Sequence, residues 1–257
     1  IDDKDYFSDE RCILVEDCLK TLQDLARFHR EKLGTPIIGI TGTNGKTTTK
    51  ELVSAVLSQK YNILYTQGNL NNHIGVPLTL LRLTNEHDMA VVEMGANHPG
   101  EIESLVNISK PNYGLITNVG KAHLEGFGSF ENIVKTKSEL YDSVKMDNGK
   151  VFINEEDSLL YNIVKEQEIS HIKYFKSILC QSFKSQLYVS MKILYDDKEI
   201  IINSQLFGRY NMSNIVAAFT IGKYFEVPEN DIVLAIESYT PSNNRSQLIK
   251  TNNNNLF

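Results

Sequence analysis

Residues 39–51, GITGTNGKTTTKE, form a glycine-rich segment between an apolar run and a stretch with helical spacing. Glycines such as Gly42 and Gly45 let consecutive backbone N–H groups turn toward an anion, and the N-terminus of a following helix adds positive potential. Lys46 has the reach to meet the β- and γ-phosphates of a nucleotide, and the Thr47 hydroxyl can bind Mg²⁺. The strict consensus requires a further glycine five residues before Gly45, which this chain lacks. A simple tight turn is the alternative, but the strand–loop–helix context favours a phosphate-binding loop.

Two other segments place polar side chains directly after predicted strands. In residues 91–103, VVEMGANHPGEIE, Glu93 stands at the carboxyl end of a strand, where ligands bind in open α/β sheets. Its carboxylate can hold Mg²⁺ directly or through water, although many acids at such places are merely exposed. In residues 116–129, ITNVGKAHLEGFGS, His123 lies on a glycine-rich loop. Neutral imidazole is a metal ligand, although a lone histidine is more often structural.

Residues farther along the chain carry two weaker signals. Lys135 and Lys137, in KTKSEL, are on residue type alone typical of solvated helix charges. Asn211 and Asn214 are three positions apart, so both amides project from one face of a first helical turn. Amides both donate and accept hydrogen bonds, which suits the edge of an adenine ring. Capping of the helix by one of them is the structural alternative.

The elements that must position these residues alternate along the chain. Apolar runs and helical periodicity, punctuated by glycine and proline, follow one another from residue 37 onward. Such alternation predicts an α/β fold, a mostly parallel sheet flanked by helices. The strands are expected at 37–41, 62–66, 89–94, 113–119 and 150–154, and the helices at 46–59, 77–83, 99–108, 130–144 and 157–165.

Both ends of the chain depart from this pattern. Apolar residues at helical spacing predict a helix over residues 9–32, which Gly34-Thr35-Pro36 then breaks. After His171, alternating polarity predicts a small β-hairpin, and two helices follow it. The hairpin strands are expected at 187–194 and 199–202, and the helices at 211–225 and 229–238.

Composition limits the possible classes of function. With 257 residues, 41% of them hydrophobic, the chain can build a substantial core. Lys and Arg number 26 against 32 Asp and Glu, and this net charge of −6 argues against a nucleic-acid binder. No apolar run approaches the ~20 residues of a membrane helix. The three cysteines show no CxxC spacing, so neither a disulfide framework nor a thiolate metal site is expected, and a reducing cytoplasm fits best.

Five motifs in one order resemble the Mur ligase family, the ATP-dependent amide ligases of bacterial cell-wall synthesis. They are GTNGKTT, NHIGVPLTLL, VVEMGANHPGEIE, ITNVGKAHLEGFGSFENIVKTKSEL and GRYNMSNIVAA. The last four look like the family member that adds D-alanyl-D-alanine to UDP-N-acetylmuramoyl-tripeptide. The resemblance implies that the tripeptide carboxylate attacks the γ-phosphorus of ATP, and that the amine of D-alanyl-D-alanine then attacks the acyl phosphate.

The resemblance also assigns roles to residues. It implies two Mg²⁺ ions, with Thr47 as a ligand of the first, Glu93 as a further metal ligand and His123 as a ligand of the second. Lys137 occupies the place of a lysine that family members carbamylate with CO₂, which turns a cation into a magnesium-binding anion. Catalytic roles fall on Lys46, His123 and Lys137. The implied ATP contacts are Gly42, Thr43, Asn44, Gly45, Lys46, Thr47 and Thr48, with Asn211 and Asn214 at adenine and Arg245 near the ribose and phosphates. The muramoyl-peptide is expected at Asn69, Asn71, Asn72 and His73.

The family pattern further implies a division of the chain. Residues 1–35 resemble the tail of an amino-terminal UDP-sugar domain and its linker, and residues 36–257 a central ATP-binding domain. A carboxy-terminal ligase domain is expected to be absent, so the fragment alone is expected to ligate weakly or not at all. The expected protein is a monomer in the cytoplasm, without nucleic-acid partners or membrane insertion.

Two other readings share these features. A sister Mur ligase or a folylpolyglutamate-type ligase has the same phosphate loop and lysine, and the motifs around Asn71 and Glu93 are what favour the D-alanyl-D-alanine enzyme. A nucleotide-binding module or signalling NTPase would hydrolyse ATP without a carboxylate acceptor. That reading leaves the segments around His123 and Lys137 without a role.

Overall fold

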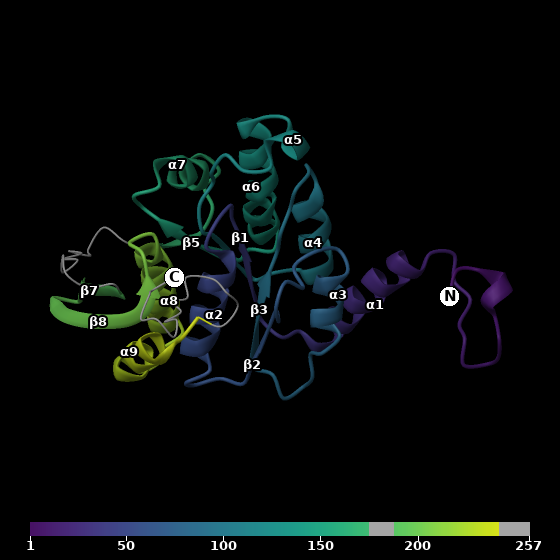
Figure 1. The fold of residues 1–257 in the computed structure, drawn as a ribbon, viewed down its shortest axis with the longest axis horizontal. Coiled ribbons are helices and arrows are strands. Elements are labelled where there is room, and N and C mark those ends of the chain that lie inside the picture. Colours follow the sequence, from purple (N-terminus) through teal and green to yellow (C-terminus); the bar gives the residue numbers. More distant parts are fainter. Residues whose placement is uncertain (175–187, 242–257) are drawn as a thin grey trace, which may run out of the picture.

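The computed structural model describes residues 1–174 and 188–241. Its centre is a sheet of six parallel strands in the order β2-β3-β1-β4-β5-β6 (Figure 1). The strands are short, and the central ones, β1 and β3, are completely buried, as strands covered on both faces are. Their bounds are β1 (Ile37–Thr41), β2 (Ile63–Tyr65), β3 (Met89–Glu93), β4 (Tyr113–Ile116), β5 (Lys150–Asn154) and β6 (His171–Tyr174). The predicted α/β fold is therefore confirmed.

Helices cover both faces of the sheet (Figure 1). Side chains of β1 alternate between the two cores: Ile38 and Ile40 belong to one hydrophobic cluster and Ile37 to the other. The first cluster lies under α2 (Lys46–Leu57), α8 (Asn211–Tyr224) and α9 (Glu229–Ser238). The second lies under α3 (Gly75–Leu80), α4 (Glu101–Ser109), α6 (Phe130–Met146) and α7 (Ser158–Glu166), and it reaches Ala26 of α1 (Cys18–Leu33).

The order of the strands decides which loops meet. Since β1 lies between β3 and β4, the loops that follow these three parallel strands lie side by side at the carboxyl edge of the sheet. The first of them is the glycine-rich loop, the second follows Glu93, and the third leads through His123 into the short helix α5 (Leu124–Phe127). The fold thereby gathers residues from distant parts of the sequence.

A two-stranded antiparallel sheet lies apart from the main one. It consists of β7 (Tyr188–Tyr195) and β8 (Lys198–Phe207), and it confirms the predicted hairpin, with a second strand longer than expected. Asp196 and Asp197 form its turn with φ of 48° and 60°, the left-handed pair that a two-residue hairpin turn needs. Met191 and Ile202 pack into the core beneath α2 and α8.

The amino-terminal helix is shorter than predicted. It begins at Cys18, not at residue 9, because the Asp17 side chain accepts the N–H of Lys20 at 2.9 Å and caps it. A short 3-10 helix, η1 (Lys4–Tyr6), precedes it. Ile13 and Leu14, expected on the helix, lie outside it with 76% and 42% of their surface exposed. Figure 1 shows residues 1–17 projecting away from the sheet.

Several other bounds differ from those predicted. The strand expected at 113–119 ends at Ile116, where the chain turns into the loop before α5, and neither α5 nor β6 was predicted. The helix expected at 77–83 spans Gly75–Leu80. Position 187, the expected start of the hairpin, lies outside the described residues.

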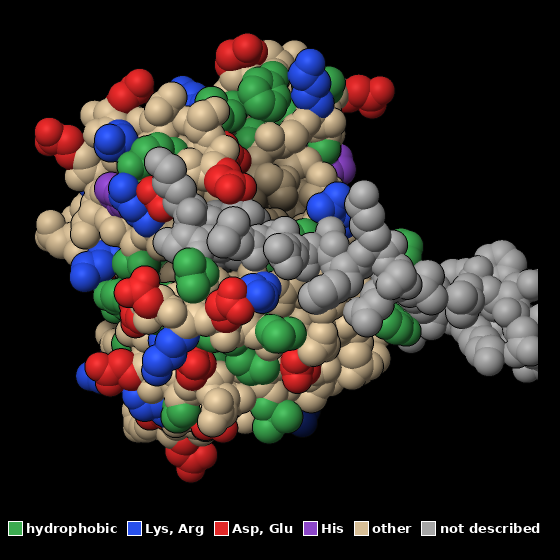
Figure 2. Space-filling view, turned by 90° about the vertical axis from the view of Figure 1, so that its left-hand side faces the viewer, with side chains coloured by type: hydrophobic (Ala, Val, Ile, Leu, Met, Phe, Trp, Pro, Cys, Tyr) green, Lys and Arg blue, Asp and Glu red, His purple; other side chains and the backbone are tan. Residues whose placement is uncertain are grey.

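Two observations concern the classes of nucleic-acid binder and membrane protein. On the face shown in Figure 2, basic and acidic side chains of the described residues are interspersed, without a concentrated basic area. No helix within residues 1–174 and 188–241 is long and apolar enough to cross a membrane.

Candidate functional site

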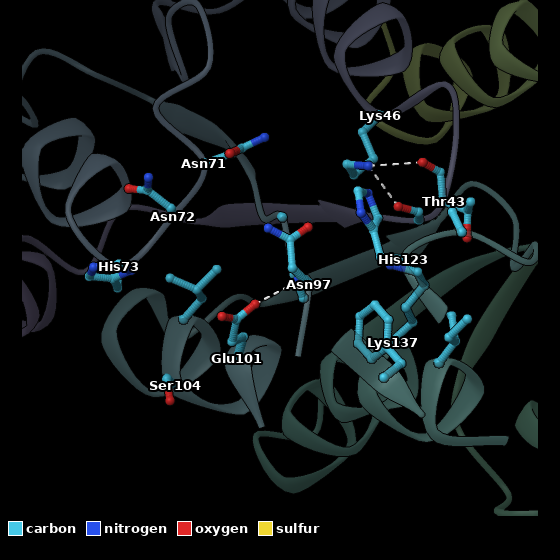
Figure 3. A pocket seen from close by; sticks show the side chains of 17 residues that line it. Thr43, Lys46, Asn71, Asn72, His73, Asn97, Glu101, Ser104, His123 and Lys137 are labelled. Atoms are coloured by element: carbon cyan, nitrogen blue, oxygen red, sulfur yellow. Dashed lines mark hydrogen bonds between the residues drawn. The ribbon is translucent and has the colours of Figure 1, made fainter. Parts of the chain in front are cut away.

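A cavity of about 530 Å³ opens at the carboxyl edge of the sheet (Figure 3). Its walls come from the loops after β1, β2, β3 and β4 and from α4 and α6. Polar side chains from all of these elements reach it. Among the residues that line it are Thr43, Lys46, Asn71, Asn72, His73, Asn97, Glu101, His123 and Lys137.

Glycine is required in the loop after β1. Gly42 and Gly45 have φ of +145° and +79°, a region that favours glycine. A Cβ on Gly42 would lie 1.9 Å from the Thr117 hydroxyl oxygen, and one on Gly45 would lie 2.8 Å from Asn214 Oδ1. Lys46 bends over this loop, its ammonium donating to the carbonyls of Gly42 and Thr43 at 2.8 and 3.1 Å (Figure 3). The strand, glycine turn and helix expected around Lys46 are thus present, and contact of Lys46 with phosphate stays a prediction.

The loop after β4 braces the glycine loop. The N–H groups of Thr43 and Asn44 donate to the carbonyl and to the Oδ1 of Asn118 at 2.9 and 3.1 Å. In return, the Asn118 amide and the Thr117 hydroxyl donate to the Asn44 carbonyl at 3.0 and 2.6 Å. These bonds fix the conformation of the glycine loop.

Helix α2 starts directly behind this loop. Its N-cap is Gly45, and within the described chain no side chain caps it by a hydrogen bond. The first N–H groups of a helix lack intrahelical partners and carry positive potential, which suits an anion. Loop and helix therefore fit a phosphate group.

Glu93 is buried beside this helix with 1% of its surface exposed. Its Oε1 accepts hydrogen bonds from the Thr47 hydroxyl at 3.1 Å and from the Asn71 amide at 2.8 Å. Its Oε2 is also buried, and no group in the described part of the chain hydrogen-bonds to it. A buried carboxylate oxygen without a partner is costly, and a divalent cation would satisfy it. The residues present therefore fit Mg²⁺ at Thr47 and Glu93.

The metal environment is sparse. Among residues 1–174 and 188–241, no three His, Cys, Asp or Glu side chains gather as a set of metal ligands. Mg²⁺ is usually held through one or two carboxylates, with water and substrate phosphates filling its other positions. A single buried carboxylate beside a phosphate loop is consistent with that mode of binding. The binding of two Mg²⁺ ions stays a prediction.

His123 and Lys137 both line the cavity, His123 from the N-cap of α5 and Lys137 from the middle of α6. His123 adopts φ of +53°, and its carbonyl accepts the N–H groups of Gly126 and Phe127 at 3.0 and 3.1 Å. Such a conformation in a residue other than glycine is uncommon and clusters at functional sites. Figure 3 shows the imidazole projecting into the cavity toward Lys46. The role of His123 as a metal ligand stays a prediction.

Lys137 is not the solvated helix charge that its residue type suggests. Only 3% of its surface is exposed, and its ammonium lies 5.9 Å from the centre of the Phe127 ring. Burial, and secondarily the charge of Lys46, lower the pKa of Lys137 to about 8. At pH 7 about a tenth of this amine is therefore uncharged, far more than for a lysine with an ordinary pKa. An uncharged amine is the form that reacts with CO₂.

The asparagine-rich loop after β2 divides into parts. Asn71, Asn72 and His73 line the cavity, whereas Asn69 is exposed outside the set of lining residues. Asn71 reaches Glu93, as described above. The Asn72 Oδ1 accepts the N–H groups of Ile74 and Gly75 at 3.1 and 2.9 Å and so fixes the start of α3. Contact of these residues with the muramoyl-peptide stays a prediction.

Asn211 and Asn214 are neighbours on α8, as their spacing predicted. The Asn214 amide donates to Asn211 Oδ1 at 2.8 Å, and its own Oδ1 accepts the Thr49 hydroxyl at 3.0 Å. Only 1% and 4% of their surfaces are exposed, so they tie α8 to α2. Their contact with adenine stays a prediction. Arg245 lies outside the described residues.

Several residues that line the cavity were not singled out from the sequence, among them Asn97, Glu101 and Phe127. Glu101 Oε2 accepts the N–H groups of Asn97 and His98 at 2.6 and 3.1 Å. Burial acts to raise the pKa of Glu101, and these hydrogen bonds overcome it, so the pKa lies below its ordinary value. The sequence did contain a signal for this contact, because Glu101 is an acid in the first turn of a helix that follows Pro99 and Gly100.

Comparison of the sequence with known protein families finds a match. A model of the Mur ligase middle domain matches residues 40–222, which include every element of the cavity described above. The chain belongs to the Mur ligase family. The predicted family resemblance is confirmed.

Relatives within the Mur ligase family share one name. A UDP-N-acetylmuramoyl-tripeptide–D-alanyl-D-alanine ligase of Bacillus subtilis is 36% identical over 93% of this chain and 52% of its own length. The ligase of the same name from Escherichia coli is 44% identical over 57% of this chain and 32% of its own length. The chain therefore spans about half the length, or less, of these curated relatives.

Solved structures of Mur ligases agree in fold. MurF from Acinetobacter baumannii superposes with a TM-score of 0.84 at 30% identity, covering 93% of this chain and 54% of that one. MurF from Thermotoga maritima, solved in complex with ADP, gives 0.82 at 26% identity, covering 95% of this chain and 58% of that one.

Proposed function

We propose that this chain is the ATP-binding part of a MurF-type ligase that joins D-alanyl-D-alanine to UDP-N-acetylmuramoyl-tripeptide in peptidoglycan precursor synthesis. The observation that carries the proposal is the buried Glu93 carboxylate. One of its oxygens is held by Thr47 of the phosphate loop, and no described group bonds to the other. If the glycine loop were a simple tight turn that binds no nucleotide, this buried carboxylate would have no explanation.

The reaction sets an electrostatic problem for these residues. The tripeptide carboxylate attacks the γ-phosphorus of ATP, ADP leaves, and the amine of D-alanyl-D-alanine then displaces phosphate from the acyl phosphate. The attacking carboxylate and the triphosphate repel each other, so positive charge must lie between them. Lys46 and the N-terminus of α2 supply it from one side. No nucleophilic side chain is needed.

Magnesium held by Thr47 and Glu93 would neutralise phosphate oxygens and align the γ-phosphorus. Lys137, on the opposite wall of the cavity, is suited to carbamylation because its lowered pKa leaves part of the amine uncharged. As a carbamate it would present an anion toward the region of His123. These two residues would then serve a second cation.

The assignment extends to the rest of the molecule. We assign residues 1–35 to the end of a preceding UDP-sugar domain and its linker, and residues 36–257 to the central domain. The second half of α1 packs on α3 and α4, so it contributes to the central fold as well. We further propose that the enzyme is cytoplasmic and monomeric.

The proposal is tested by measuring the affinity for ATP with Mg²⁺ and with EDTA, in the wild type and in Glu93→Gln. We expect Glu93→Gln to lose most of the gain that Mg²⁺ confers, about tenfold or more, and to keep the metal-free affinity. Glu103→Gln, an exposed change on α4, is the matched control. An undiminished magnesium gain in Glu93→Gln would remove the proposed metal site.

The acceptor distinguishes this function from its sisters. The assay uses the full-length protein. It combines UDP-N-acetylmuramoyl-tripeptide with D-alanyl-D-alanine in one reaction and with single amino acids in others. A separate reaction combines a folate with glutamate. Product with D-alanyl-D-alanine alone is the expected result. Product with glutamate on folate would favour the folylpolyglutamate-type reading.

A further inference from the structure

Thr66 and Lys50 lie behind the cavity and take no part in lining it. Thr66 directly follows β2, and Lys50 lies in the second turn of α2. Both are completely buried. Neither residue is among those expected to bind phosphate, magnesium or the muramoyl-peptide.

Thr66 uses its backbone and its side chain on different elements. Its N–H donates to the Val91 carbonyl at 3.0 Å, which continues the pairing of β2 with β3. Its hydroxyl oxygen accepts the N–H of Glu93 at 3.0 Å. Its carbonyl accepts the Lys50 ammonium at 2.8 Å. Thr66 thereby connects the end of β3 with α2.

These are the two elements that carry the expected magnesium ligands. Thr47 stands in the first turn of α2 and Glu93 at the last position of β3. Lys50 is three residues beyond Thr47, on a neighbouring part of the same helix face. The Thr47 hydroxyl donates to the Glu93 carboxylate at 3.1 Å across the space between α2 and β3. The contacts from Lys50 through Thr66 to the Glu93 backbone connect the same two elements.

The fold itself does not demand a lysine at this place. The Lys50 ammonium is removed from water. It contacts the Thr66 carbonyl, Glu51 Oε1 at 3.3 Å and the Tyr65 ring, whose centre is 5.6 Å away. Burying a charge costs several kcal/mol, on the order of what its partners return, and an apolar side chain of similar volume often serves stability as well or better. Methionine has that shape. The charge at Lys50 is therefore better explained by positioning than by stability.

We propose that Thr66, anchored by Lys50, is a positioning residue that sets the separation of Thr47 and Glu93 for magnesium. The inference rests on the proposed function, since it presumes that these two side chains bind the metal. Groups that orient metal ligands without touching the metal typically change metal affinity by about 10–100-fold when they are removed.

The test compares Thr66→Val with Thr66→Ser. Valine has nearly the shape of threonine but no hydroxyl to accept the Glu93 N–H, whereas serine keeps that oxygen. For each protein the dissociation constant of ADP is measured with Mg²⁺ and with EDTA, and the ratio of the two is the readout. We expect Thr66→Val to lose about tenfold of the magnesium gain, with the EDTA value unchanged and Thr66→Ser like the wild type.

Hydrogen exchange provides a second readout that needs no ligand. The Glu93 amide should exchange faster in Thr66→Val than in Thr66→Ser, because only the serine can still accept its hydrogen bond. Lys50→Met keeps the Thr66 hydroxyl but removes its anchor, and we expect it to lower the magnesium gain in the same direction. It also serves as the test if Thr66→Val does not fold.

The outcomes separate the two claims. A magnesium gain in Thr66→Val equal to that of the wild type, or an equal loss in the valine and serine variants, overturns the role of the Thr66 hydroxyl. A full gain in Lys50→Met overturns the anchoring. A wild type in which magnesium confers no gain overturns the proposed function itself.

Discussion

At the scale of single residues, Lys137 shows how burial changes chemistry without changing the side chain. Its amine has a pKa of about 8 in the folded protein against 10.5 for an ordinary lysine, first because it is desolvated and second because Lys46 is near. Between these two values the unfolded chain holds the proton more tightly than the folded one. Folding stability therefore rises with pH across that window, and the penalty for burying the charge is complete below pH 8.

Replacing Lys137 by methionine should remove this penalty. In CO₂-free buffer we expect Lys137→Met to be more stable than the wild type at pH 7, by on the order of 3 kcal/mol. The difference should shrink as the pH rises from about 8 toward 10.5. Urea unfolding at several pH values measures it, with Lys135→Met as the exposed control on the same helix. A difference that stays constant or grows with pH would contradict the lowered pKa.

At the scale of elements, the local chemistry of the sequence predicted the main sheet well. Five strands, the hairpin and the glycine loop between β1 and α2 followed from apolar runs bounded by glycine and proline. The start of α1 was wrong because Ile13 and Leu14 continued a helical pattern that Asp17 ends by capping. Short β6 and α5 carry too few residues for a periodic signal.

The candidate site was only partly visible at this scale. Motifs identified the loops, and their neighbourhood followed from the order of parallel strands. Sequence did not reveal that Asn71 contacts Glu93 or that Lys50 and Lys137 are buried. Those facts depend on how helices pack on the sheet, which residue types alone do not specify.

Helix α1 offers a test of where the folding unit begins. Arg30 is 6% exposed and donates to the carbonyls of Ser109 and Lys110, each at 2.7 Å, and to Asn112 Oδ1 at 3.0 Å. Arg30→Met removes the donor to the Ser109 and Lys110 carbonyls, while Asn112 Oδ1 keeps the N–H of Ile37. We therefore expect a loss of about 3 kcal/mol in the free energy of unfolding. Arg27→Met, on the exposed side of the same helix, should change it by less than about 0.5 kcal/mol. Equal values in urea unfolding would show that α1 is only attached to the domain.

At the scale of the whole molecule, the chain spans about half of the relatives it matches. In the proposed division into domains, residues 36–257 hold ATP and do not by themselves hold the amine acceptor. We therefore expect residues 1–257 to bind ATP but to form little ligation product. Mass spectrometry after incubation with ATP, Mg²⁺, UDP-N-acetylmuramoyl-tripeptide and D-alanyl-D-alanine measures that product. Robust ligation would show that the assignment of domains is wrong.

The central claim is that the glycine loop and its lysine bind the phosphates of ATP. Isothermal titration of ATP with Mg²⁺ into the wild type, Lys46→Ala and the exposed control Lys135→Ala tests it most directly. A hydrogen bond from a charged group contributes about 1.5–3 kcal/mol, so Lys46→Ala should bind about tenfold more weakly or worse, and Lys135→Ala like the wild type. Equal affinity in the wild type and Lys46→Ala would contradict the account.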